Sequence, residues 1–216
     1  MQHIIAEMNS HTDYNIPSDT PPVHFTSEPP EERKKTKPSF WTELATFFVI
    51  AVCIVLPFRW FVAEPYIVSG TSMFPTFDTG HYLIVDKLSY RIHAPARYDV
   101  IVMVFPKDTT KDFIKRIIGL PGETVVIKSG VVSIKNTAHP DGIILDQSFV
   151  TYPKRDDTLT VTLTSNEYFV MGDNRAGSYD SRYWGPLPAS DIIGHPVLRL
   201  LPISKIGISP GYESPE

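Results

Sequence analysis

Hydroxyl and amine side chains are concentrated in three polar segments that interrupt stretches of apolar residues. The first segment, residues 68–76, reads VSGTSMFPT. Gly70 permits a tight backbone and Pro75 fixes the chain beyond it, so Ser72 is held on a constrained turn. Such a serine is either an ordinary turn residue or a nucleophile for acyl transfer.

The second segment, residues 112–123, reads DFIKRIIGLPGE and contains two adjacent cations, Lys115 and Arg116. Side chains alternate between the faces of a strand, so we expect one of the two cations to point inward. A buried lysine is either paired with an acid or neutral. A neutral lysine can remove the proton of a serine hydroxyl, which requires its pKa to fall by a few units from about 10.4. Burial among apolar neighbours shifts the pKa in that direction.

The third segment, residues 172–186, reads GDNRAGSYDSRYWGP. It is dense in side chains that hydrogen-bond locally and is open to a second interpretation as a simple polar loop.

Together the three segments supply a nucleophile and a base without a histidine. The seven histidines show no metal-ligand spacing and there is one cysteine, so we expect no metal, disulfide framework or cofactor. The net charge of −4 argues against nucleic acid as a partner.

An apolar run precedes these segments. Residues 44–58 are 15 consecutive uncharged residues, and basic residues cluster at 33–37. With flanking tryptophans the run approaches the roughly 20 residues of a spanning helix. We therefore expect a disordered cytoplasmic tail over 1–38 and a single transmembrane anchor over 39–62, with the rest of the chain outside the cytoplasm. The alternatives are a buried helix of a soluble domain and a cleaved signal peptide.

Short β-branched and aromatic runs follow, which favour strands. They cover residues 82–85, 100–105, 113–118, 124–127, 131–134, 168–171 and 197–201. Ser129-Gly130 is typical of a hairpin turn, and residues 158–164 alternate as in a strand with one wet face. The pattern predicts a mainly β fold, with an antiparallel, partly barrel-like domain over 63–204 and a polar tail over 205–216.

The three segments, in this order after an anchor, resemble the motifs of bacterial type I signal peptidases, which are membrane-anchored serine endopeptidases with a Ser-Lys dyad. The resemblance covers the anchor and most of residues 64–200. It implies that Ser72, not Ser69, is the nucleophile and that Lys115 is the general base.

The same resemblance implies supporting roles in the third segment. Ser178 would hydrogen-bond and orient Lys115, while Asp180 and Arg182 would form an ion pair. Val68 and Ile114 would help to line shallow substrate pockets.

The sequence departs from the family pattern at several positions. Gly70 stands where some relatives carry a hydroxyl that helps to form the oxyanion hole, so the hole would rely on backbone N–H groups at Gly70 and Ser72. His81 and Glu123 stand where aspartate is more usual, and Tyr98 where glycine is more usual. These positions are structural in the family and leave the dyad intact.

The implied reaction removes signal peptides from secreted preproteins after a small-x-small motif, through an acyl-enzyme. The preprotein would bind as an extended strand, and the location would be the bacterial plasma membrane, with lipid as a further partner. Two alternatives stay open. One is a specialised Ser-Lys maturation peptidase of the conjugative-transfer type. The other is an inactive, membrane-tethered peptide-binding β domain, against which the presence of both Ser72 and Lys115 argues.

Overall fold

The structure, a computed structural model, describes residues 39–211, without the side chains of residues 57–61. The predicted tail over 1–38 and the last five residues of the tail predicted for 205–216 lie outside this range. The helix α1 (Phe40–Phe61) occupies the predicted apolar run.

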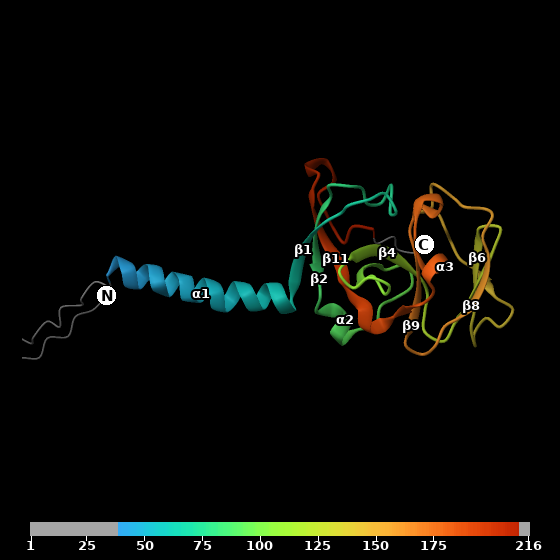
Figure 1. The fold of residues 1–216 in the computed structure, drawn as a ribbon, viewed down its shortest axis with the longest axis horizontal. Coiled ribbons are helices and arrows are strands. Elements are labelled where there is room, and N and C mark those ends of the chain that lie inside the picture. The colour runs from blue at the N-terminus through green and yellow to red at the C-terminus, as the bar shows by residue number, and fades with distance from the viewer. Residues whose placement is uncertain (1–38, 212–216) are drawn as a thin grey trace, which may run out of the picture. The chain divides into compact units, whose positions relative to one another are not determined.

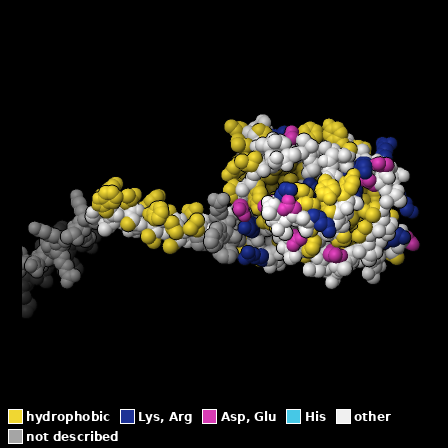
Figure 2. All heavy atoms as spheres, in the orientation of Figure 1, with side chains coloured by type: hydrophobic (Ala, Val, Ile, Leu, Met, Phe, Trp, Pro, Cys, Tyr) yellow, Lys and Arg dark blue, Asp and Glu magenta, His cyan; other side chains and the backbone are white. Residues whose placement is uncertain are grey.

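Helix α1 exposes large apolar side chains around its circumference, among them Phe47 (72% exposed), Phe48 (67%) and Ile54 (63%). Figure 2 shows hydrophobic side chains along the coloured part of the helix. Helices that are apolar all round normally lie in an apolar environment. Within residues 39–211, no helix is both long and apolar enough for a membrane span.

The larger of two antiparallel sheets contains eight strands and positions the site (Figure 1). Its order is β1 (Ala63–Ile67), β2 (Tyr82–Asp86), β11 (Ile192–Leu201), β3 (Val100–Val104), β4 (Asp112–Gly119), β9 (Glu167–Met171) and β10 (Leu187–Pro188), with β12 (Gly207–Ile208) also paired to β11. Strand β4 therefore lies between two neighbours, which satisfies its backbone groups on both sides. The predicted mainly β, antiparallel fold is confirmed.

The smaller sheet has the order β7 (Ile143–Ile144), β6 (Val131–Lys135), β5 (Thr124–Lys128) and β8 (Thr158–Thr162). Ser129 and Gly130 join β5 to β6 with φ of 50° and 79°, which is the left-handed backbone that a two-residue hairpin requires. Strand β8 alternates between exposed and half-buried residues. The hairpin and the alternating strand are both confirmed.

Short elements were not predicted from the sequence. They are β1, β7, β10, β12, the helices α2 (Ser89–Ile92) and α3 (Ser181–Trp184), and 3₁₀ turns at Arg175–Gly177, Ala189–Asp191 and Ile203–Lys205. Strand β1 contains a proline, which lowers strand propensity but is tolerated at a sheet edge. Most of the others are too short to carry a periodic pattern.

Three clusters of buried apolar side chains form the core. One lies between the smaller sheet and β9 and another around β3, β4 and β9. The third includes Met73, Phe77 and Leu83, exposed by 1% or less. Because two of these side chains come from the turn that carries Ser72, burial of apolar surface holds that turn against the sheet.

Candidate active site

The first and second polar segments meet at Ser72 and Lys115, which are 43 positions apart in the sequence. Lys115 Nζ lies 2.7 Å from Ser72 Oγ and donates a second hydrogen bond of 3.0 Å to the Ile114 carbonyl oxygen. Lys115 is in the middle of β4, opposite Ile101 of β3. The base is thus held by a central strand and the hydroxyl by a constrained turn.

Lys115 is almost completely buried, with 3% exposure. Its Nζ lies 5.1 Å from the centroid of the Phe113 ring. Burial lowers the pKa of Lys115 to about 8, against the opposing fields of Asp180 and Asp173. At pH 7 roughly one molecule in ten then carries a neutral amine, which can accept a proton from Ser72.

The turn that carries Ser72 is fixed at both ends by backbone hydrogen bonds. Val68 N–H donates to the His81 carbonyl at 2.9 Å, and Phe77 N–H donates to the Met73 carbonyl at 2.9 Å. Ser72 itself is partly exposed. The hydroxyl is therefore positioned by buried neighbours while it stays open to a substrate.

The third segment holds the same turn from its other side. Asn174 N–H donates to the Ser72 carbonyl at 3.0 Å, and its side-chain amide donates to the Thr71 carbonyl at 3.1 Å. A Cβ at Gly172 would collide with the Ser72 carbonyl oxygen and with Ser178 Oγ. Only glycine permits this close approach of the two segments.

Ser178 is 5% exposed, and its Oγ has no hydrogen-bond partner in the part of the chain that the structure describes. The hydrogen bond expected between Ser178 and Lys115 is absent; Lys115 Nζ instead contacts Ser72 Oγ and the Ile114 carbonyl. This expectation is corrected: Ser178 packs beside Gly172, next to the Ser72 carbonyl.

Asp180 and Arg182 form a bidentate ion pair, with Nε–Oδ1 and Nη2–Oδ2 distances of 2.8 and 2.9 Å. Asp180 is fully buried and also accepts the Gly172 N–H at 3.0 Å. Arg182 Nη1 donates to Asp157 at 2.6 Å. The pair therefore ties the third segment to itself and to the loop before β8.

The Gly70 amide is engaged elsewhere. Its N–H donates to Thr79 Oγ1 at 3.1 Å, with φ of +104° at Gly70. The expectation that the Gly70 N–H contributes to an oxyanion hole is corrected, because this donor is used to close the turn. Ser72 N–H donates to no residue in the range 39–211 and stays available.

Both cations of the second segment are buried, whereas the sequence predicted only one. Arg116 is 0% exposed and forms a bidentate ion pair with Asp173, at 2.8 and 2.7 Å. Its Nη1 donates to the carbonyl oxygens of Tyr98 and Gly211. The prediction was wrong because strand alternation says nothing about whether both faces of a central strand are covered. Asp173 is a structural partner that no local pattern marks.

The departures from the family pattern are accommodated locally. Tyr98 has φ of +72°, the left-handed region that favours glycine. His81 is 4% exposed and its Nδ1 accepts the Asp78 N–H at 3.3 Å; burial, aided by nearby cations, lowers its pKa. Glu123 is buried in an ion pair of 2.6 Å with Arg97.

A cavity of about 340 Å³ opens beside the dyad and is lined by the end of β1, the Ser72 turn and the start of β4. Val68 and Ile114 both line it, the first 7% exposed and the second half-buried. Tyr179 of the third segment forms part of the wall. In the part of the chain with described positions, no cluster of three or more His, Cys, Asp or Glu could hold a metal ion.

Comparison with known proteins adds to this geometry. The family model "Signal peptidase, peptidase S26" matches residues 41–201. The "Probable signal peptidase I-1" of Synechocystis sp. is 38% identical over 180 residues, covering 79% of this chain and 89% of that protein. Signal peptidase I of Bacillus caldolyticus is 35% identical, covering 72% and 89%. Thylakoidal processing peptidase 1 of Arabidopsis thaliana is 32% identical, covering 72% and 47%.

Proposed function

The chain belongs to the signal peptidase family, peptidase S26, and from this premise we propose that it is a type I signal peptidase with Ser72 as nucleophile and Lys115 as general base. The observation that carries the proposal is the 2.7 Å contact between Lys115 Nζ and Ser72 Oγ. A buried amine with a lowered pKa, next to a partly exposed hydroxyl, is the arrangement that nucleophilic catalysis requires.

The proposed reaction proceeds in two steps. Neutral Lys115 takes the Ser72 proton as Oγ attacks the scissile carbonyl carbon, and Lys115 then gives that proton to the leaving amine as the C–N bond breaks. Water next attacks the ester carbonyl and loses a proton to Lys115, and Lys115 returns that proton to Ser72 Oγ as the acyl C–O bond breaks. This releases the new C-terminal carboxyl group and restores the Ser72 hydroxyl. We propose that the Ser72 N–H stabilises the oxyanion in each step.

The cavity beside the dyad is the proposed site for the end of the signal peptide. Its walls come from strands on two sides, which suits an extended chain between them. Val68 and Ile114 narrow it with branched apolar side chains, so small side chains at the cleavage site are expected to fit best. The proposed substrates are therefore secreted preproteins with a small-x-small motif.

Residues Ser178, Asp180 and Arg182 are proposed to support the dyad. The Asp180–Arg182 ion pair is buried, with 0% and 4% side-chain exposure, and orders the segment that binds the Ser72 carbonyl. Ser178 packs beside Gly172, next to the Ser72 carbonyl, and is proposed to help hold the turn that carries the nucleophile.

We further propose that residues 39–62 anchor the chain in the bacterial plasma membrane, with the N-terminus in the cytoplasm. The exposed apolar side chains of α1 support this, as do the basic residues at 33–37. Protease treatment of intact spheroplasts is expected to remove the β domain. Protection of that domain would contradict the orientation.

The dyad is tested by cleavage of a model preprotein in detergent. Ser72→Ala and Lys115→Ala are each expected to abolish measurable turnover, whereas Ser69→Ala, in the same turn, is expected to retain kcat close to that of wild type. If both dyad variants cleave at near wild-type rates, the assignment of Ser72 and Lys115 is wrong.

A further inference from the structure

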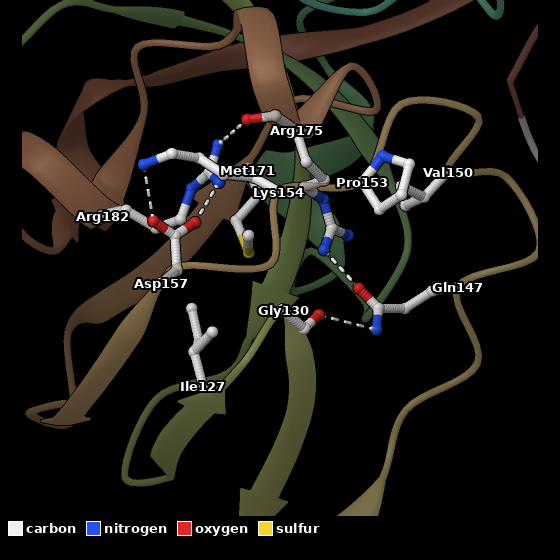
Figure 3. A pocket seen from close by; sticks show the side chains of 10 residues that line it. All are labelled: Ile127, Gly130, Gln147, Val150, Pro153, Lys154, Asp157, Met171, Arg175 and Arg182. Atoms are coloured by element: carbon white, nitrogen blue, oxygen red, sulfur yellow. Dashed lines mark hydrogen bonds and ion pairs between the residues drawn. The ribbon is translucent and has the colours of Figure 1, made fainter.

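A second cavity, of about 130 Å³, lies away from the dyad, between the β5–β6 hairpin, β9, the loop before β8 and the third polar segment (Figure 3). Three cations line it: Lys154, Arg175 and Arg182. The single carboxylate in its lining is that of Asp157. The wall of this cavity therefore has an excess of positive charge.

Two of the three cations are matched by carboxylates. Arg182 donates to Asp157 at 2.6 Å and is also paired with Asp180. Lys154 lies 2.7 Å from Asp157 and 3.7 Å from Asp156, and it donates to the Tyr183 hydroxyl at 3.1 Å. None of the ion pairs in the described range includes Arg175.

Arg175 is 3% exposed. Its Nε donates to the Gly172 carbonyl at 3.1 Å and its Nη1 donates to Gln147 Oε1, but Nη2 has no partner among residues 39–211. Figure 3 shows the guanidinium between Gln147 and the loop of Val150 and Pro153. Asp180 and Asp173 lie near enough to act on Arg175 electrostatically, but neither contacts it directly. A buried guanidinium with an unused donor and no carboxylate in direct contact is unfavourable unless an anion or ordered water completes it.

Burial and the neighbouring Arg182 lower the pKa of Arg175 to about 10, so the guanidinium keeps its charge at neutral pH. A cavity of about 130 Å³ has the volume of about four water molecules, so it can hold a single small oxyanion. Guanidinium and ammonium groups together suit the oxygens of a phosphate group.

We propose that this cavity binds a small phosphate-class oxyanion, with Arg175 at its base and Lys154 at its side. The bound anion supplies the counter-charge for Arg175, the cation of this wall that forms no ion pair in the described structure. Arg175 follows Asn174, whose N–H holds the Ser72 carbonyl, so occupancy also stabilises the segment that supports the nucleophile turn.

Thermal unfolding of the full chain in detergent tests the proposal, with inorganic phosphate compared to sodium chloride at matched ionic strength. Once phosphate exceeds its Kd about fivefold, Tm is expected to rise by roughly 2–4 °C above the chloride control. Equal Tm values in the two salts at all concentrations would overturn the proposal and leave a cavity filled by water alone.

Gln147→Glu is the decisive variant, because it is nearly isosteric and supplies a carboxylate beside Arg175. It is expected to raise Tm in the absence of phosphate and to remove the response to phosphate. Lys154→Gln is expected to weaken phosphate binding about tenfold, whereas Lys128→Gln, an exposed lysine on β5, should respond as wild type does. A Gln147→Glu variant that responds as strongly as wild type contradicts the assigned site.

The phosphate group can belong to a free ion or to a lipid. The full chain in nanodiscs of phosphatidylcholine, with and without phosphatidic acid, separates these sources. Stabilisation by phosphatidic acid that is lost in Gln147→Glu assigns the site to a lipid headgroup, and stabilisation by inorganic phosphate alone assigns it to the free ion. Absence of both effects overturns the proposal. Both measurements follow stability and not catalysis, so their outcome does not depend on the roles assigned to Ser72 and Lys115.

Discussion

Lys115 and Arg116 are neighbours on β4 that are equally buried and yet have opposite environments. Lys115, on one face, has no carboxylate within hydrogen-bonding distance in the described structure and contacts Ser72 Oγ and Ile114 O. Arg116, on the other face, has both of its outer edges occupied by Asp173 and two carbonyl oxygens. Burial is common to both, so the difference lies in the partners.

This difference in partners gives Lys115 a chemical role and Arg116 a structural one. Burial without a counter-ion destabilises the charged amine and makes Lys115 a usable base at neutral pH. Burial with a bidentate carboxylate makes Arg116 a fixed connection between β4 and the third segment. Substitution of either residue tests this contrast.

The largest effect is expected from Lys115→Arg, because arginine cannot become neutral at pH 7. We expect kcat/KM for preprotein cleavage to fall by at least about 10³-fold. Lys111→Arg, which changes an exposed lysine just before β4, is the matched control and should cleave normally. Substantial activity in Lys115→Arg would show that the base is another group.

The next largest effect is expected on stability, from loss of the ion pair between Arg116 and Asp173. Asp173→Asn leaves Arg116 buried without its counter-charge and also weakens the acceptor of the Thr76 hydroxyl, which lies 2.6 Å away. We expect the free energy of unfolding at pH 7 to fall by about 3–5 kcal/mol. The double variant Arg116→Met with Asp173→Leu should recover much of this loss in denaturant titrations. A double variant no more stable than Asp173→Asn would show that the cost is not one of unpaired charge.

A third, smaller effect has the opposite sign. Because the folded-state pKa of Lys115 is about 8 and its ordinary value is 10.5, the unfolded chain binds more protons between these values, and stability rises with pH in that window. Below pH 8 the charged lysine destabilises the fold by about 3 kcal/mol. Lys115→Met should therefore be more stable at pH 7, by about 2 kcal/mol after loss of the hydrogen bond to Ser72.

The same comparison of Lys115→Met with wild type at pH 10.5 supplies the control. There the lysine is neutral in the folded state and half protonated in the unfolded chain, so the charge penalty falls to about 0.4 kcal/mol and most of the advantage of methionine is expected to disappear. An equal difference in unfolding free energy at pH 7 and pH 10.5 would contradict a lowered pKa at Lys115.

The contrast between the two faces also shows how far the sequence could predict the site. The nucleophile and base are recognisable because each lies in a short segment of unusual residue types, and the strands around them have clear local patterns. The pairing of Arg116 with Asp173 is not recognisable, because the two residues are 57 positions apart and neither stands in a pattern that names the other.

Two finer details were also beyond the sequence. Gly70 was expected to offer its N–H to an oxyanion, but whether an amide is free depends on which side chain folds over it, and here that is Thr79. Ser178 was expected to contact Lys115, but the side-chain conformations in the packed structure decide which groups an amine contacts, and here these are Ser72 Oγ and the Ile114 carbonyl. The residue types therefore identify the functional segments, whereas the hydrogen-bond partners of single groups depend on tertiary packing.

The smallest effect is expected from Asp180→Asn, a change that keeps shape and removes charge. Asp180 raises the pKa of Lys115 against the lowering effect of burial. Loss of its charge should therefore lower that pKa further, and the acid limb of the kcat/KM profile should move to lower pH by less than about one unit. Asp157→Asn removes the other carboxylate that binds Arg182 and is the matched control, with no shift expected. A limb that moves to higher pH in Asp180→Asn, or that moves equally in both variants, would show that the pKa of Lys115 responds to the order of the third segment and not to the charge of Asp180.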